Sequence, residues 1–101
     1  MFPPFIELAH FIISSPNRDK AINTSQQLYD LFLKQPSVEA KNLFGPAPAA
    51  LEQINNRYRY QIMLKMADLE ELLKTVKEVT DSLKKPSDTR LSIDINPYFM
   101  M

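Results

Sequence analysis

Residues 57–66 read Arg57-Tyr58-Arg59-Tyr60-Gln61-Ile62-Met63-Leu64-Lys65-Met66, and apolar and polar side chains alternate clearly along them. Successive side chains of a β-strand point to opposite faces of the sheet, so alternate residues share a face. One set is Tyr58, Tyr60, Ile62, Leu64 and Met66, and the other is Arg57, Arg59, Gln61, Met63 and Lys65. The alternation predicts a strand with one covered apolar face and one wet polar face.

The chain before this strand predicts a strand, a helix and a second strand. Residues 5–13 are apolar and rich in β-formers, which is typical of a central strand covered on at least one side. Asn17 is a good N-cap for the helix that follows, and Pro36 ends that helix. Residues 38–44 are more polar and predict an edge strand.

The segment Gly-Pro-Ala-Pro-Ala at residues 45–49 interrupts the strands. Its two prolines lack N–H donors, and Gly45 is the only glycine in the chain. We expect a bend here with a backbone demand that only glycine meets, such as a positive φ or a bulge. The third strand then lies within residues 50–66, with a turn or bulge at Asn55-Asn56.

The last third of the chain predicts a second helix and a closing strand. Asp68 opens the helix, with Glu71 placed to complete a capping box, and Pro86 ends it. Its apolar stripe comprises Leu69, Leu72, Leu73, Val76, Val79 and Leu83. Residues 90–96 alternate apolar and polar side chains, which predicts the fourth strand.

The order β-α-β-β-α-β predicts an α+β fold, a ferredoxin-like sandwich with two helices on one face of a four-stranded sheet. With 101 residues the chain is long enough for one domain, residues 1–101, around one modest core. Twelve basic and twelve acidic side chains give a net charge of zero, which argues against a free-standing nucleic-acid binder. The chain has no cysteine and no apolar run that approaches the roughly 18 residues of a membrane helix.

The residues favour binding over catalysis. His10 is the only histidine and lies inside an apolar strand, so we expect it in or near the core. No Gly-Lys-Ser/Thr phosphate-binding loop and no Asp-Glu metal-binding pair is present. The best binding candidate is the polar face of the third strand, which carries Arg57, Arg59, Gln61 and Lys65 and competes with a merely solvated surface.

Three short segments in fixed order, with the opening Pro3-Pro4-Phe5, resemble a known family. They are residues 45–49, the Arg-Tyr-Arg-Tyr-Gln of residues 57–61 and the Ile-Asp-Ile-Asn-Pro of residues 93–97. Together they resemble the C-terminal domain of primosomal protein N′, a bacterial replication-restart helicase family. The resemblance implies a fold like that of a ribosomal S10-type subunit. It also implies that the chain is a C-terminal fragment of a larger cytoplasmic helicase, with the helicase core absent.

The parent would be an ATP-dependent 3′-to-5′ DNA helicase that acts at stalled forks and loads the primosome. Its ATP, magnesium and zinc sites would lie outside this chain, so we expect no cofactor and no enzyme activity in this fragment. Carried over by motif, Arg57 and Gln61 would bind the acidic C-terminal tail of the single-stranded-DNA-binding protein. Arg59, Lys65 and Tyr58 are candidates for contact with DNA or phosphate, although Tyr58 and Tyr60 also suit core packing. The resemblance further implies that the domain contacts branched DNA and the rest of the helicase chain, and nothing points to a membrane.

The chain departs from the family pattern at two positions. Glu7 lies where many relatives carry arginine, which weakens any phosphate site at this edge, and Asn96 replaces the second acid of the closing motif. Asp94 remains, and we expect it to hold the turn before Pro97 or to pair with Arg57 or Arg59. If the rest of a helicase is missing, apolar side chains that it would cover should be exposed: Phe5, Phe11, Phe99, Met100 and Met101.

Two other functions remain open from the residues. The first is a free-standing ferredoxin-like protein that binds RNA or associates with the ribosome, which predicts a complete gene of about this length. The second is a small enzyme of the acylphosphatase-like type. That enzyme needs a glycine-rich loop to hold an anion, and a chain with one glycine makes it remote.

Overall fold

A computed structural model describes residues 6–96 of the chain, with residues 50–54 described by their backbone alone. The elements, in chain order, are β1 (Glu7–Ser15), α1 (Arg18–Leu33), the 3-10 helix η1 (Ala40–Asn42), β2 (Leu43–Ile54), β3 (Arg57–Met66), α2 (Leu69–Ser82) and β4 (Arg90–Ile95). The four strands form one sheet in the order β2-β3-β1-β4, and every neighbouring pair is antiparallel. This arrangement confirms the predicted ferredoxin-like α+β fold.

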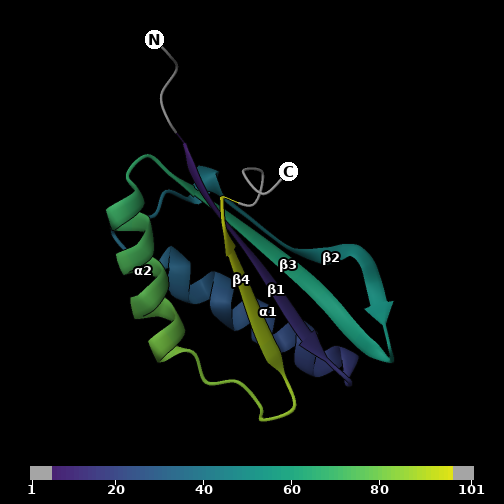
Figure 1. Ribbon diagram of the computed structural model, residues 1–101. Coiled ribbons are helices and arrows are strands. Elements are labelled where there is room, and N and C mark those ends of the chain that lie inside the picture. Colours follow the sequence, from purple (N-terminus) through teal and green to yellow (C-terminus); the bar gives the residue numbers. More distant parts are fainter. Residues whose placement is uncertain (1–5, 97–101) are drawn as a thin grey trace.

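Both helices lie on one face of the sheet, and Figure 1 shows α1 behind the strands with α2 at their side. Alternate residues of β1 and β3 meet the helices in a single apolar core. The fully buried members of this core are Ala9, Phe11, Ile13, Leu28, Phe32, Ile62, Leu64, Leu72 and Val79. The alternation predicted along β3 is confirmed, because Tyr60, Ile62, Leu64 and Met66 are buried and the residues between them are not.

Phe11 corrects one expectation. It was expected at the surface, but its side chain is completely buried, with its ring centroid 5.1 Å from that of Phe32 in α1. The reason is the strand period, since Phe11 shares a face with Ala9 and Ile13 and therefore points at the helices. The other residues of that expectation, Phe5, Phe99, Met100 and Met101, lie outside the described residues.

The helix caps follow the sequence. The side chain of Asn17 accepts a hydrogen bond from the Lys20 amide (3.1 Å), and Asp68 accepts one from the Glu70 amide (3.0 Å). The predicted apolar stripe of α2 is only partly buried, because Leu69 and Leu73 are 41% and 46% exposed. These two leucines leave an apolar flank on α2.

Strand β2 differs from the prediction in its limits. The expected edge strand at residues 38–44 begins instead as η1, and the expected bend at residues 45–49 lies inside β2. The ladder with β3 shifts register between Phe44 and Ala47, and Gly45 has φ +109°. A Cβ at Gly45 would lie 2.6 Å from the Gln61 carbonyl oxygen, so the expected positive φ and bulge are both confirmed.

The hairpin between β2 and β3 turns at Asn55-Asn56. Both residues have positive φ, at 53° and 63°, which is the backbone of the tight two-residue hairpin turn. Asparagine tolerates this left-handed region better than most residues. The turn predicted at these two residues is therefore confirmed, and it fixes where β3 begins and which of its side chains face the helices.

Candidate functional site: the open face of the sheet

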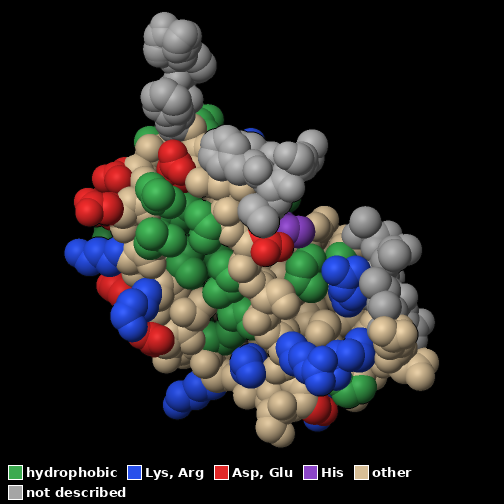
Figure 2. Space-filling model, viewed as in Figure 1, with side chains coloured by type: hydrophobic (Ala, Val, Ile, Leu, Met, Phe, Trp, Pro, Cys, Tyr) green, Lys and Arg blue, Asp and Glu red, His purple; other side chains and the backbone are tan. Residues whose placement is uncertain are grey.

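The face of the sheet opposite the helices is open, and Figure 1 looks onto it. The pairing register places polar side chains of three strands side by side on this face. They are Arg57, Arg59, Gln61 and Lys65 from β3, His10 and Ser14 from β1, and Arg90, Ser92 and Asp94 from β4. Figure 2 shows basic side chains gathered at the end of this face where β3 and β4 begin.

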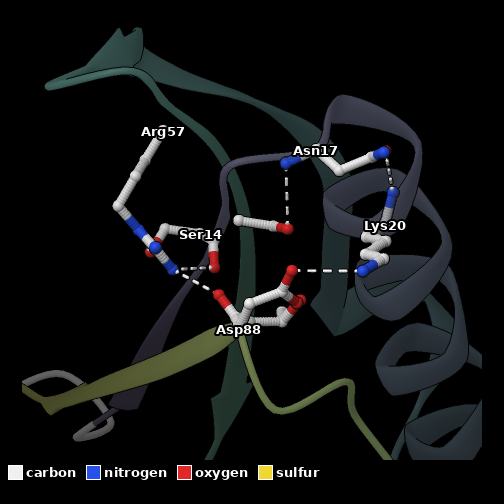
Figure 3. A network of polar contacts seen from close by, with 7 residues as sticks. Ser14, Asn17, Lys20, Arg57 and Asp88 are labelled. Carbon is white, nitrogen blue, oxygen red and sulfur yellow. Dashed lines mark hydrogen bonds and ion pairs between the residues drawn. The ribbon is translucent and has the colours of Figure 1, made fainter.

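Arg57 is held in place by three hydrogen bonds. Its Nε donates to the Ser14 hydroxyl (3.2 Å), and its Nη2 donates to the carbonyls of Ser14 (2.8 Å) and Asp88 (2.8 Å). The guanidinium thereby joins β3 to the end of β1 and to the loop before β4, as Figure 3 shows. Arg57 bonds to these partners rather than to Asp94, which was one of the predicted pairings.

The network continues from Asp88 to the start of α1. Lys20 Nζ lies 3.1 Å from Asp88 Oδ2, and the Lys20 amide is the donor to the Asn17 cap. The hydrogen bond from Lys20 lowers the pKa of the Asp88 carboxyl below its ordinary value. Because both side chains of the ion pair are well exposed, it contributes little by itself to folding.

A shallow hollow of about 400 Å³ lies between β3, β1 and β4. It is lined by Ile12, Ser14, Asn55, Arg57, Arg59, Arg90, Ser92 and Asp94. Two of the predicted site residues, Arg57 and Arg59, therefore share one hollow. Arg90 was not among the predicted site residues, and its only sequence signal is the β4 alternation, because its place beside Ser14 depends on the strand register.

Gln61 lies two residues beyond Arg59 on the same face but outside the lining of the hollow. Its Oε1 is 2.9 Å from Nε2 of His10, and both side chains are half-buried. His10 is therefore a half-buried histidine, as expected, and it lies on the open face rather than inside the helix-facing core. The hydrogen bond to His10 was not foreseen, because it needs the register between β1 and β3.

The remaining predicted contacts are spread over the molecule. Lys65 lies at the far end of β3, with its Nζ 5.2 Å from the centroid of the Phe44 ring. Tyr58 is half-buried on the helix-facing side of β3, opposite Arg59 and Lys65. Tyr60 is on that side too, and its hydroxyl accepts a hydrogen bond from Arg18 Nε (3.3 Å). The structure thus brings Arg57, Arg59, Gln61 and Lys65 onto one face and places Tyr58 on the other.

The two departures from the family pattern contact each other. The Asn96 side-chain amide donates to Glu7 Oε1 (2.8 Å), and its Oδ1 accepts from the Leu8 amide (2.7 Å). The Asn96 backbone has φ 52°, in the left-handed region, and its N–H donates to the Leu8 carbonyl (2.6 Å). Glu7 and Asn96 together fasten the end of β4 to the start of β1.

Within residues 6–96, no three His, Asp or Glu side chains gather closely enough to hold a metal ion. No helix in the same part of the chain is long and apolar enough to cross a membrane.

Comparison with known proteins gives matches over nearly the whole chain. A family model described as "Primosomal protein N C-terminal domain" matches residues 1–98. The replication restart protein PriA of Bacillus subtilis (strain 168) is 30% identical to this chain, in an alignment that covers 99% of this chain. The probable replication restart protein PriA of Deinococcus radiodurans is 32% identical, and the alignment covers 95% of this chain. The chain spans only 13% and 10% of the lengths of these two relatives.

Among solved structures, a de novo designed protein named Foldit4 has a TM-score of 0.68 and 12% sequence identity to this chain. The match covers 91% of this chain and 97% of the designed one. At this identity the similarity bears on the fold alone.

Proposed function

The chain belongs to the primosomal protein N C-terminal domain family, and from that premise we propose that it is a docking domain of a longer replication-restart helicase. The domain would bind the acidic C-terminal tail of the single-stranded-DNA-binding protein and help to hold branched DNA. ATP hydrolysis and 3′-to-5′ unwinding at stalled forks would belong to the rest of the parent chain, together with its zinc.

The observation that carries the tail-binding proposal is that the side chains of Arg57 and Gln61 lie on the same open face of β3. A guanidinium and a primary amide both donate hydrogen bonds, and a terminal carboxylate accepts them. Four residues along a strand separate the two side chains by about 13 Å. That spacing fits the last few residues of an extended acidic peptide better than it fits a single small ion.

The bonds that hold Arg57 support this role. A long side chain that is already fixed loses less conformational entropy when a ligand binds. Its bonds to Ser14 and Asp88 use Nε and Nη2. Arg59 and Arg90 add positive charge beside it, and Asp94 is the one acid among the described residues that line the same hollow.

DNA contact has weaker support. Arg59 and Lys65 lie on the open face and could contact phosphates, whereas Tyr58 would have to act from the opposite side of the sheet. The chain as a whole has no basic excess. We therefore propose that the domain binds branched DNA together with other parts of the parent helicase.

Contact with the rest of the parent chain has support on another surface. Leu69 and Leu73 of α2 are 41% and 46% exposed, whereas Thr75 of the same helix hydrogen-bonds Ser37 (3.1 Å). Ile93 of β4 is 38% exposed, and Figure 2 shows apolar side chains gathered between α2 and β4. An apolar surface of this kind suits a permanent contact with another domain.

The test of tail binding is an NMR titration of the chain with an acidic peptide that ends in phenylalanine and a free carboxylate. We expect the largest shifts at Arg57 and Gln61, and a loss of at least about tenfold in affinity in Gln61→Ala. Gln61→Ala is the sharper variant, because Arg57→Ala also removes the bonds to Ser14 and Asp88.

Lys84→Ala removes an exposed basic side chain beyond α2 and serves as the matched control. It should leave the affinity unchanged. Shifts confined to other surfaces, or equal affinity in Gln61→Ala and the wild type, would show that the tail does not dock here. Measurable RNA binding by the chain alone, with no peptide binding, would favour the free-standing RNA-binding protein instead.

A further inference from the structure

The hydrogen bond between His10 and Gln61 determines which end of the Gln61 amide is available to a ligand. The carboxamide has an oxygen that only accepts and an NH2 that only donates, and rotation about its last torsion exchanges them. A carboxylate ligand only accepts hydrogen bonds, so just one of the two orientations suits it. A glutamine without a partner would divide its time between both.

Resting on the proposed tail binding, we infer that His10 is a positioning residue that turns the NH2 of Gln61 toward the ligand. His10 Nε2 lies 2.9 Å from Gln61 Oε1, and because an amide oxygen only accepts, this contact requires a His10 ring with a proton on Nε2. The oxygen is then occupied on the β1 side, and the NH2 is left for the open face. Arg57 and Gln61 consequently present donors only.

The sheet register explains why this contact forms. Met63 is the β3 partner of His10, and Gln61 lies diagonally across from His10 on the same face. Long side chains reach such diagonal neighbours in an antiparallel pair. Both side chains are half-buried, so water competes less for the bond than it would at an exposed site.

Asp94 in β4 is the cross-strand partner of His10 on its second side. Asp94 is exposed, and no hydrogen bond joins it to His10 within the described residues. A neutral ring with its proton on Nε2 and a doubly protonated ring both donate to Gln61 Oε1. The orientation of the amide is therefore the same in either state of His10.

The consequence is selectivity for a free carboxylate. Because Arg57 and Gln61 offer donors only, they should prefer a peptide with a terminal carboxylate over the same peptide with a terminal amide, whose NH2 would face other donors. The experiment measures the affinities of both peptides for four proteins: wild type, His10→Leu, His10→Gln and Gln61→Glu. Isothermal titration provides the affinities, and thermal unfolding confirms that each variant is folded.

We expect His10→Leu to lower the affinity for the carboxylate peptide by about three- to tenfold and to reduce the preference over the amidated peptide. His10→Gln retains a donor of similar reach and should recover most of the affinity for the carboxylate peptide and most of the preference over the amidated peptide. Gln61→Glu can still accept from His10 but turns a carboxylate toward the ligand, so it should abolish binding of the acid peptide.

A second measurement does not depend on the peptide. The ring nitrogens of His10, observed by NMR in the free chain, should carry a proton on Nε2, and a neutral ring protonated only at Nδ1 would overturn the inference. Normal binding and normal selectivity in His10→Leu would also overturn it while leaving tail binding intact. If the wild type itself does not bind the acid peptide, the tail-binding proposal is wrong, and the role of His10 in it is wrong as well.

Discussion

Strand β3 has two sides that differ in how their residues are held. On the helix-facing side Tyr60, Ile62 and Leu64 are 7%, 0% and 0% exposed and take part in the core or its border. On the open side Arg57 and Gln61 are half-buried and are held by hydrogen bonds to other strands and loops. One side is stabilised by apolar packing and the other by directional polar contacts.

The difference separates stability from binding along a single strand. Apolar burial depends on volume, so a change on the helix-facing side should alter the free energy of unfolding. Polar residues on a wet face usually tolerate change, so substitutions there should mainly alter ligand affinity. Arg57 is the exception, since its bonds to Ser14 and Asp88 give it a part in both.

The largest expected effect is on the helix-facing side of the sheet, at Phe11 in the neighbouring strand β1. Phe11→Ala removes a completely buried ring that contacts Phe32, and we expect it to lower the free energy of unfolding by about 3–5 kcal/mol. The matched variant Ile12→Ala changes the next residue, which is half-buried on the open face, and should cost clearly less. Urea denaturation of both variants measures the difference, and equal losses would show that the two faces are not energetically distinct.

A smaller effect is expected at Arg57, the open-face residue that also has a structural role. Arg57→Ala removes a charged donor from three hydrogen bonds between β3, β1 and the loop before β4, which should cost about 2 kcal/mol. Arg90→Ala removes an exposed arginine from the same hollow and should change stability by less than about 0.5 kcal/mol. If both variants unfold at the wild-type urea concentration, Arg57 has no structural role.

The contact between Glu7 and Asn96 gives a third test. Asn96→Asp keeps an acceptor for the Leu8 amide but replaces the donor to Glu7 with a second carboxylate, and we expect a loss of about 1–2 kcal/mol. The double variant Glu7→Gln with Asn96→Asp restores a donor and should recover much of the lost free energy of unfolding. A single variant as stable as the wild type would mean that the hydrogen bond to Glu7 contributes nothing.

The smallest effect is at the exposed ion pair. The pKa of Asp88 is lowered, chiefly by its hydrogen bond with Lys20, so the folded state binds this proton less readily than the unfolded state. The pair therefore stabilises the fold at pH values above the ordinary 3.8 of the carboxyl, and that contribution disappears as the pH falls through the lowered pKa. Asp88→Asn should lose this part of the acid dependence in unfolding curves from pH 6 to pH 2, and an unchanged curve would count against it.

The sequence was most informative where a single local rule sufficed. The period-two pattern in β3, the caps Asn17 and Asp68 and the demand for glycine at Gly45 each depend on neighbouring residues, and each is confirmed. Phe11 was misjudged because its exposure was inferred from a missing partner domain rather than from the strand period. The limits of β2 were missed because a strand with a bulge carries two prolines that normally end one.

The order of the helices and strands, the two faces of β3 and the family all follow from the amino-acid sequence, because periodicity, caps and motifs are local properties of the chain. Contacts between residues of different strands, in contrast, are seen only in the folded structure. Arg57 with Asp88, His10 with Gln61 and Glu7 with Asn96 are separated by 31, 51 and 89 positions in the chain. Such pairs depend on strand order and register, and these are set by the packing of the whole domain.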